Sequence, residues 1–179
     1  QADMWDWSRE RLAAAGYEHY EISNWARPGE ECRHNVVYWR NGDWLGLGPG
    51  AHSHLAGVRF ADVYSPTQYV RKVDEAATLD LPSDSREMIR AMPQVTFVDE
   101  LSLELQMADT AILALRLHDG LDVADFERRY GKPVEAQFGE QIAEFTSLGF
   151  LERADGRVRL TDRGRYVANE VFLKLLPDD

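Results

Sequence analysis

The clearest hydrophobic pattern lies in the second half of the chain. Apolar residues recur every three or four positions over 99–117, 122–130 and 133–148, which predicts three amphipathic helices. Asp122 can cap the second helix, and Gly131 follows it at a position where a helix C-terminus favours glycine. This part of the chain is therefore expected to open with three packed helices.

The pattern then changes to the alternation typical of strands. Residues 151–160 contain an Asp-Gly pair at their centre, which predicts a hairpin with a two-residue type I′ turn and places Leu151 opposite Leu160. A last helix follows, with Thr161 or Asp162 as its N-cap. Three helices, a hairpin and a closing helix describe a winged-helix-like module.

The first part of the chain has a different pattern. Residues 3–15 predict an amphipathic helix with Met4 and Trp7 on its apolar face, and a short strand is expected over 17–22. A further helix is expected over 65–77. A helix, a glycine and then a strand is the order found in α/β units.

Residues 34–40 fit two structures. Their β-branched and aromatic residues favour a strand by propensity. A short helix is the alternative, with His34 and Tyr38 on one side and Asn35 and Trp39 on the next. We favour the helix.

The middle of the chain is expected to link two domains. Residues 44–47 predict a short strand, and the prolines and polar residues after residue 77 interrupt any long pattern. We therefore expect domains at 1–80 and 99–179, joined by a connection over 81–98.

Composition narrows the class of protein. The formal net charge is −11, and both halves of the chain are acidic, which argues against broad binding to nucleic acid. The single cysteine, Cys32, cannot form a disulfide within the chain, and no apolar run is long enough to span a membrane. The N-terminal residues lack a signal-peptide pattern, and we expect the chain to be a piece of a longer cytoplasmic protein.

Residues 33–54 bring aromatic residues, glycines and three of the five histidines close together. Glycine lets a backbone approach a ligand closely, and aromatic residues beside such a backbone indicate a pocket for a flat or phosphate-bearing ligand. A tight turn over a packed aromatic cluster explains the same residues. His52 and His54 belong to this stretch, and histidines spaced in this way are more often hydrogen-bonded than metal-bound.

Three motifs resemble a known family. YEISNWARPG at 20–29, RHNVVYW at 33–39 and LGLGPGAH at 45–52 resemble the later part of HemW-type proteins, which are radical S-adenosylmethionine (SAM) relatives of the oxygen-independent coproporphyrinogen III oxidase HemN. Residues 99–179 resemble the C-terminal domain of that family, including LxLRLxxG at 113–120. The resemblance implies an α+β fold. In it, the last elements of a partial (β/α) radical SAM barrel precede a mainly helical winged-helix-like domain.

The resemblance also implies cofactors. The full-length family binds a [4Fe–4S] cluster through a CxxxCxxC loop, and SAM occupies the open site on the cluster, where it is cleaved reductively. This chain has only Cys32, at a position where the family has no cluster ligand. We therefore expect the cluster loop to lie outside this chain, and we expect the chain alone to have no radical SAM activity.

Site residues are carried over from the family motifs. The resemblance implicates the HNxxYW motif in haem binding, with His34 as the iron ligand, and it places the turn after residue 46 near SAM. The structural alternative is that the motif residues pack and cap a helix, and that the turn only links two strands. The expected haem residues are His34, Asn35, Tyr38 and Trp39, and the expected SAM-side residues are Leu47, Gly48, Gly50 and Ala51.

Three functions remain open at this point. The HNxxYW motif favours a fragment of a haem chaperone that binds haem or porphyrin and transfers it to acceptor proteins. The second is an oxygen-independent coproporphyrinogen III oxidase. The third is a winged-helix module that binds a partner or nucleic acid through five arginines between 153 and 165. We also expect self-association, because a truncated barrel exposes strand edges.

Overall fold

The computed structural model describes residues 2–177 and divides into two compact units. The first unit comprises Gln1–Asn41 and Met107–Asp179, and the second comprises Gly42–Gln106. The described strands all pair antiparallel, and together with the helices they form an α+β structure. The predicted ranges 1–80, 81–98 and 99–179 concern family domains and stay a prediction.

The first unit begins with helix α1 (Ala2–Ala14), in agreement with the sequence pattern. The predicted apolar face is wrong, because Met4 and Trp7 are 73% and 66% exposed. The rings of Trp5 and Tyr166 meet edge to face, with their centroids 5.4 Å apart. The C-terminal residues of the chain therefore determine which side of α1 packs.

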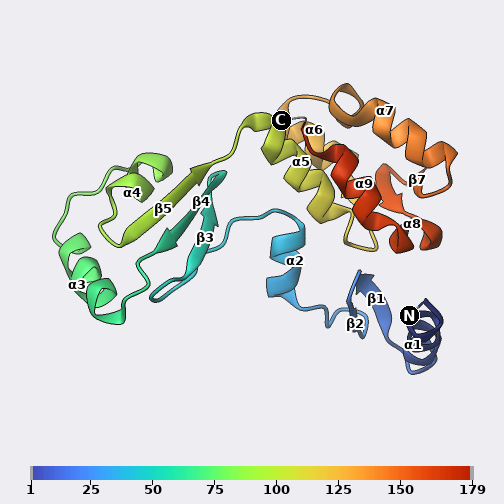
Figure 1. The fold of residues 1–179 in the computed structure, drawn as a ribbon, viewed down its shortest axis with the longest axis horizontal. Helices are drawn as coiled ribbons and strands as arrows, with labels where there is room; N and C mark the ends of the chain where they lie inside the picture. Colours follow the sequence, from blue (N-terminus) through green and yellow to red (C-terminus); the bar gives the residue numbers. More distant parts are fainter. Residues whose placement is uncertain (1, 178–179) are drawn as a thin grey trace. The chain divides into compact units, whose positions relative to one another are not determined.

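A short hairpin follows α1 (Figure 1). Strand β1 (Glu18–Glu21) confirms the strand expected over 17–22, and it pairs with β2 (Asn24–Ala26), which the sequence pattern did not predict. On its other side β1 meets the segment after helix α5 (Leu103–Ala114), because Tyr20 O accepts a hydrogen bond from His118 N at 2.9 Å. This pairing connects the beginning of the chain to its C-terminal module.

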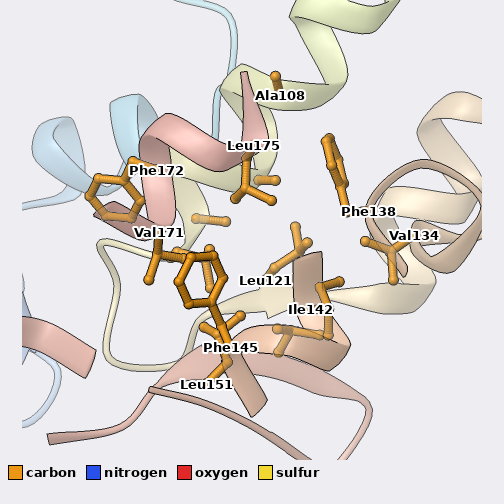
Figure 2. Close-up of a cluster of buried hydrophobic side chains, with 14 of the residues drawn as sticks. Ala108, Leu121, Val134, Phe138, Ile142, Phe145, Leu151, Val171, Phe172 and Leu175 are labelled. Atoms are coloured by element: carbon orange, nitrogen blue, oxygen red, sulfur yellow. The ribbon is translucent and has the colours of Figure 1, made fainter. Parts of the chain in front are cut away.

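The C-terminal module contains the main hydrophobic core (Figure 2). Apolar side chains of its helices and of its three-stranded sheet, which has the order β6-β8-β7, point toward one another there. Its elements are α5 (Leu103–Ala114), β6 (Leu121–Asp122), α6 (Val123–Tyr130), α7 (Val134–Ser147), β7 (Leu151–Ala154), β8 (Arg157–Leu160), α8 (Asp162–Tyr166) and α9 (Ala168–Leu175).

The predicted hairpin of this module is confirmed. Leu151 pairs with Leu160 across β7 and β8, and both are buried. Asp155 and Gly156 have φ angles of +52° and +72°, as a type I′ turn requires. The expected single closing helix is instead two, α8 and α9, because the backbone at Val167 leaves the helical region (φ −117°, ψ 21°).

The second unit is a three-stranded antiparallel sheet with two helices (Figure 1). Strand β4 lies between β3 and β5, and Val58, Phe60 and Ile89 form the core of this unit. Its elements are β3 (His52–Leu55), β4 (Val58–Asp62), α3 (Pro66–Ala76), α4 (Ser85–Ala91) and β5 (Val95–Glu100).

Two local predictions differ from the structure around this unit. Residues 95–100 form β5, which the sequence did not predict, and α5 consequently begins at Leu103 rather than at residue 99, whereas α4 agrees with a helical turn expected over 85–92. Residues 44–47 form only an isolated bridge, between Trp44 and His54. The apolar residues of β5 do not alternate cleanly with polar ones, which is why their periodicity did not predict a strand.

Candidate functional site

Helix α2 (Arg33–Trp39) carries the whole HNxxYW motif. The favoured helix is therefore confirmed over the strand. Cys32 occupies the N-cap position without a hydrogen bond from its side chain, and no residue of the helix is fully buried. A seven-residue helix without buried residues depends on a few side-chain contacts for its position.

One side of α2 presents an imidazole to solvent. His34 is exposed, and its ring meets the ring of Tyr38 edge to face, with the centroids 4.8 Å apart and an interplanar angle of 87°. These residues are four positions apart and so share a helix face. The contact orients the imidazole of His34 while leaving it accessible.

The neighbouring side of α2 packs against the rest of the unit. The side-chain amide of Asn35 donates to the hydroxyl of Tyr20 at 3.2 Å. The indole of Trp39 lies 5.3 Å from the guanidinium carbon of Arg116. The four expected haem residues therefore form two pairs: His34 and Tyr38 on the side with the exposed imidazole, and Asn35 and Trp39 on the side that packs against the unit.

Arg116 is a residue of this region that sequence reasoning did not single out. It belongs to the LxLRLxxG motif, and its guanidinium also lies 5.1 Å from the ring centroid of Phe172. Its Nε atom and the Nε1 atom of Trp39 are both buried and have no hydrogen-bond partner. The arginine of the motif was the available signal, but only the tertiary structure shows its contact with α2.

The expected SAM-side turn lies in the second unit. Leu47 is 88% exposed, and Gly48 and Gly50 adopt positive φ angles of +115° and +70°. The N–H of Gly48 donates to the Tyr69 hydroxyl at 3.2 Å, and Ala51 N donates to the carbonyl of Gly48 at 3.1 Å. The turn therefore uses most of its own N–H donors, since Gly50 N also donates to a backbone carbonyl.

The histidines and the buried carboxyl beside this turn have separate environments. The ring of the buried His54 bonds through Nδ1 to the Gly42 carbonyl at 3.1 Å, whereas His52 is exposed. Asp62 is buried in β4, and this burial raises the pKa of its carboxyl. Within residues 2–177, no three His, Cys, Asp or Glu side chains are grouped so that they could hold a metal ion.

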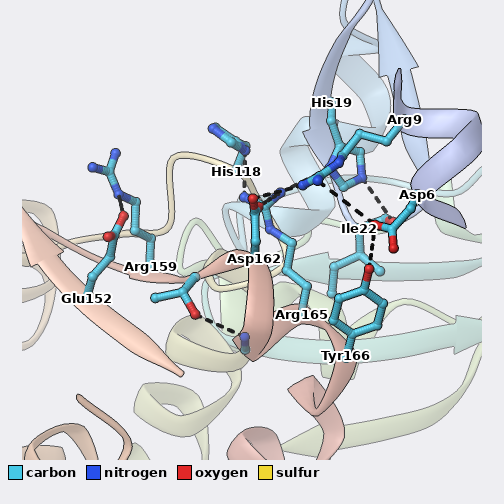
Figure 3. A network of polar contacts seen from close by, with 12 residues as sticks. Asp6, Arg9, His19, Ile22, His118, Glu152, Arg159, Asp162, Arg165 and Tyr166 are labelled. Carbon is cyan, nitrogen blue, oxygen red and sulfur yellow. Dashed lines mark hydrogen bonds and ion pairs between the residues drawn. The ribbon is translucent and has the colours of Figure 1, made fainter. Parts of the chain in front are cut away.

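A polar network joins the N-terminal elements to the C-terminal module (Figure 3). Arg165 donates to Nδ1 of His19 at 3.2 Å and to Nδ1 of His118 at 2.6 Å. Burial lowers the pKa of both histidines, and the charge of Arg165 lowers it further. Arg9 pairs with Asp162 at 2.8 Å in the same network. Both imidazoles thus act as neutral acceptors.

Most of the five arginines expected on the wing are used within the module. Arg157 lies 3.3 Å from Asp122, and Arg159 lies 2.6 Å from Glu152. Arg153 pairs with Glu135, and Arg163 lies over the ring of Phe150. Local ion pairs therefore account for most of this basic cluster.

Comparison with known proteins identifies the family. Residues 101–167 match the HemN C-terminal domain. The chain is similar to the heme chaperone HemW of Lactococcus lactis, with 33% identity over 99% of this chain and 42% of the relative. It is similar to the heme chaperone HemW of Mycobacterium tuberculosis, with 34% identity over 93% of this chain and 37% of the relative. The chain is a HemW-like member of the HemN family.

A solved structure supports the fold of this HemW-like chain. The coproporphyrinogen III oxidase HemN of Escherichia coli, described as a radical SAM enzyme, matches with a TM-score of 0.63 and 18% identity. The match covers 97% of this chain and 40% of that structure. The HemW-like chain thus spans about two fifths of the length of the proteins it matches. Among the helices formed by residues 2–177, none is both long and apolar enough to cross a membrane.

Proposed function

We propose that this chain is the haem-binding part of a HemW-like haem chaperone and that it passes haem to acceptor proteins. The observation that carries the proposal is the exposed imidazole of His34 on α2, held edge-on to Tyr38. A neutral imidazole is a common axial ligand of haem iron. Two relatives that match nearly the whole of this chain are named heme chaperones.

The residues around His34 fit a bound haem. A single accessible imidazole is sufficient as an axial ligand, so the absence of a larger metal-binding group among residues 2–177 is compatible with haem. Tyr38 provides an aromatic edge beside the imidazole, and Trp39 contributes an indole on the adjacent face. Asn35 would hold α2 in place rather than touch the porphyrin.

Haem titration followed by absorbance tests this function. We expect the Soret band of haem to shift with the wild-type chain and with His52→Ala, and the shift to be lost with His34→Ala. His52 is a matched control because its imidazole is also exposed but lies in the second unit. No shift with the wild type, or an equal shift with His34→Ala, would refute the assignment.

A [4Fe–4S] cluster does not fit the residues of this chain. Such a cluster needs several thiolates, and Cys32 is the only cysteine. We propose that the cluster and SAM are bound by the longer protein, with Leu47, Gly48, Gly50 and Ala51 on the SAM side of its partial barrel. Reduced thiolates are needed for the cluster, so a cytoplasmic location is part of the proposal.

The remaining parts of the proposal concern architecture and association. The elements before the HemN C-terminal domain would complete a radical SAM barrel in the longer protein, and the C-terminal module would be its winged-helix-like domain. Strands β3 and β5 lie at the edges of their sheet, and such edges can pair with a second chain. We therefore propose self-association of this chain. A monomeric mass in light scattering would reject it.

A further inference from the structure

Arg116 holds a positive charge that the described protein does not neutralise. Its guanidinium carbon lies 5.3 Å from the ring of Trp39 and 5.1 Å from the ring of Phe172, so the group is held between two aromatic side chains. Within residues 2–177, no carboxylate forms an ion pair with it. The side chain is half-buried, which makes an unpaired charge costly.

Two backbone hydrogen bonds fix the position of Arg116 in the chain, so its side chain starts from a well-defined backbone. Its carbonyl accepts from Ile22 N at 3.0 Å, and its own N–H donates to the Leu113 carbonyl at 3.1 Å. The first bond belongs to the pairing between the N-terminal hairpin and the segment after α5, and the second belongs to the turn that ends α5. The pairing positions Arg116 beside α2.

Arg116 and Trp39 each carry a buried side-chain donor without a hydrogen-bond partner within residues 2–177. Among the described residues, four buried side-chain atoms lack a hydrogen-bond partner, and Arg116 Nε and Trp39 Nε1 are two of them. A buried donor without an acceptor costs free energy, and native structures contain few of them. Any oxygen acceptor satisfies an N–H donor, but only an anion also pairs with the charge of the Arg116 guanidinium.

A buried carboxylate on the neighbouring strand does not provide that acceptor. Glu21 is only 1% exposed and lies opposite Leu117, next to Arg116 in the sequence. Its carboxylate accepts a hydrogen bond from the Asn24 side chain, and no ion pair joins it to Arg116. Among residues 2–177, therefore, no acceptor is found for the two donors and no carboxylate pairs with the charge of Arg116.

We propose that the guanidinium of Arg116, stacked on the ring of Trp39, binds a carboxylate, and that the carboxylate is a propionate of haem bound at α2. This rests on the haem-binding function proposed above. Trp39 follows His34 by five residues, a rise of about 7.5 Å along the helix. Haem has its iron at the centre and its propionates at the rim, so separate residues must contact them. A guanidinium binds a carboxylate in a bidentate, charge-assisted manner.

The test compares haem with haem dimethyl ester, whose propionates are uncharged. We expect the wild-type chain to bind haem about tenfold more tightly than the ester. Arg116→Gln should bind both with equal affinity and should keep the Soret maximum of the bound form, because His34 is unchanged. Arg163→Gln is the matched control, since Arg163 also lies over an aromatic ring, and it should behave as the wild type.

The outcomes distinguish a failure of the propionate site from a failure of the proposed haem binding. Equal binding of haem and ester by the wild type, or a preserved preference in Arg116→Gln, overturns the propionate site while haem binding stands. If the wild type binds haem and the ester equally, the anion that pairs with Arg116 would instead be an acidic side chain of a protein partner. No Soret shift with wild type overturns both proposals. If Arg116→Gln fails to fold by circular dichroism, the wild-type comparison decides alone.

Discussion

The core of the C-terminal module and helix α2 belong to the same compact unit but are stabilised differently. The core side chains, among them Phe126, Val134 and Val171, are fully buried and need no polar partner. Helix α2 has no fully buried residue and is placed by single contacts, such as the bond between Asn35 and Tyr20. The module therefore provides stability, whereas α2 is built to expose groups.

The difference shows where function can lie in this chain. A closely packed apolar core tolerates little change and offers no free polar group. The unsatisfied donors of Trp39 and Arg116 lie at the border between α2 and that core, where Phe172 belongs to the core and also contacts Arg116. Substitutions in the two regions test this division, because they should affect the free energy of unfolding and the haem binding to different extents.

The largest effect is expected from the core. Phe126→Ala removes a fully buried ring that contacts Tyr130 and Phe138, and it should lower the free energy of unfolding by about 3–5 kcal/mol. Urea unfolding measures the loss. Leu173→Ala, at a side chain 64% exposed, should change stability by less than about 0.5 kcal/mol. Similar losses in both variants would contradict the assignment of the core.

A smaller effect is expected at the helix cap after the hairpin. Thr161 accepts from Gly164 N at 3.0 Å and donates to the Gly149 carbonyl at 2.7 Å. Thr161→Ala should therefore cost about 1 kcal/mol in thermal or urea unfolding. Thr67→Ala, on the exposed surface of α3, is the control and should cost less than about 0.5 kcal/mol. A cost at Thr161 no greater than the control would disprove the cap.

The contact that positions α2 should contribute less to stability. Tyr20→Phe removes the hydroxyl that accepts from Asn35, and we expect a loss of about 0.5 kcal/mol together with weaker haem binding. Tyr17→Phe is a matched control, because its hydroxyl has no hydrogen bond among residues 2–177. Equal haem affinity for both variants would show that this bond does not position α2.

The smallest effect is expected from pH. Burial and Arg165 lower the pKa of His19 and His118 below the ordinary value of 6.5, so the folded state favours neutral imidazoles. Below pH 6.5 the histidines bind protons in the unfolded chain before they do so in the folded chain. The free energy of unfolding therefore decreases as the pH falls from 6.5 to the lowered pKa values of the folded state. Urea midpoints at several pH values measure this slope. A double variant, His19→Gln with His118→Gln, should flatten it, and an unchanged slope would contradict the neutral-acceptor arrangement.

Much of the local structure was predictable from the chain. The helix over the HNxxYW motif, the Asp122 cap of α6 and the register of the β7–β8 hairpin all agree with the sequence pattern. The predicted apolar face of α1 is wrong at Met4 and Trp7, which are both exposed. A helical periodicity identifies an apolar face but not the neighbour that covers it.

What the sequence determined by itself is short-range: periodicity, capping residues, turn types and the family motifs. These depend on residues a few positions apart, whose interactions are the same in any fold. Only the tertiary structure decided that β5 joins the sheet of the second unit, and that Arg116 lies against Trp39, far away along the chain. The pairing of β1 with the segment after α5 brings these residues together, and no local pattern encodes that pairing.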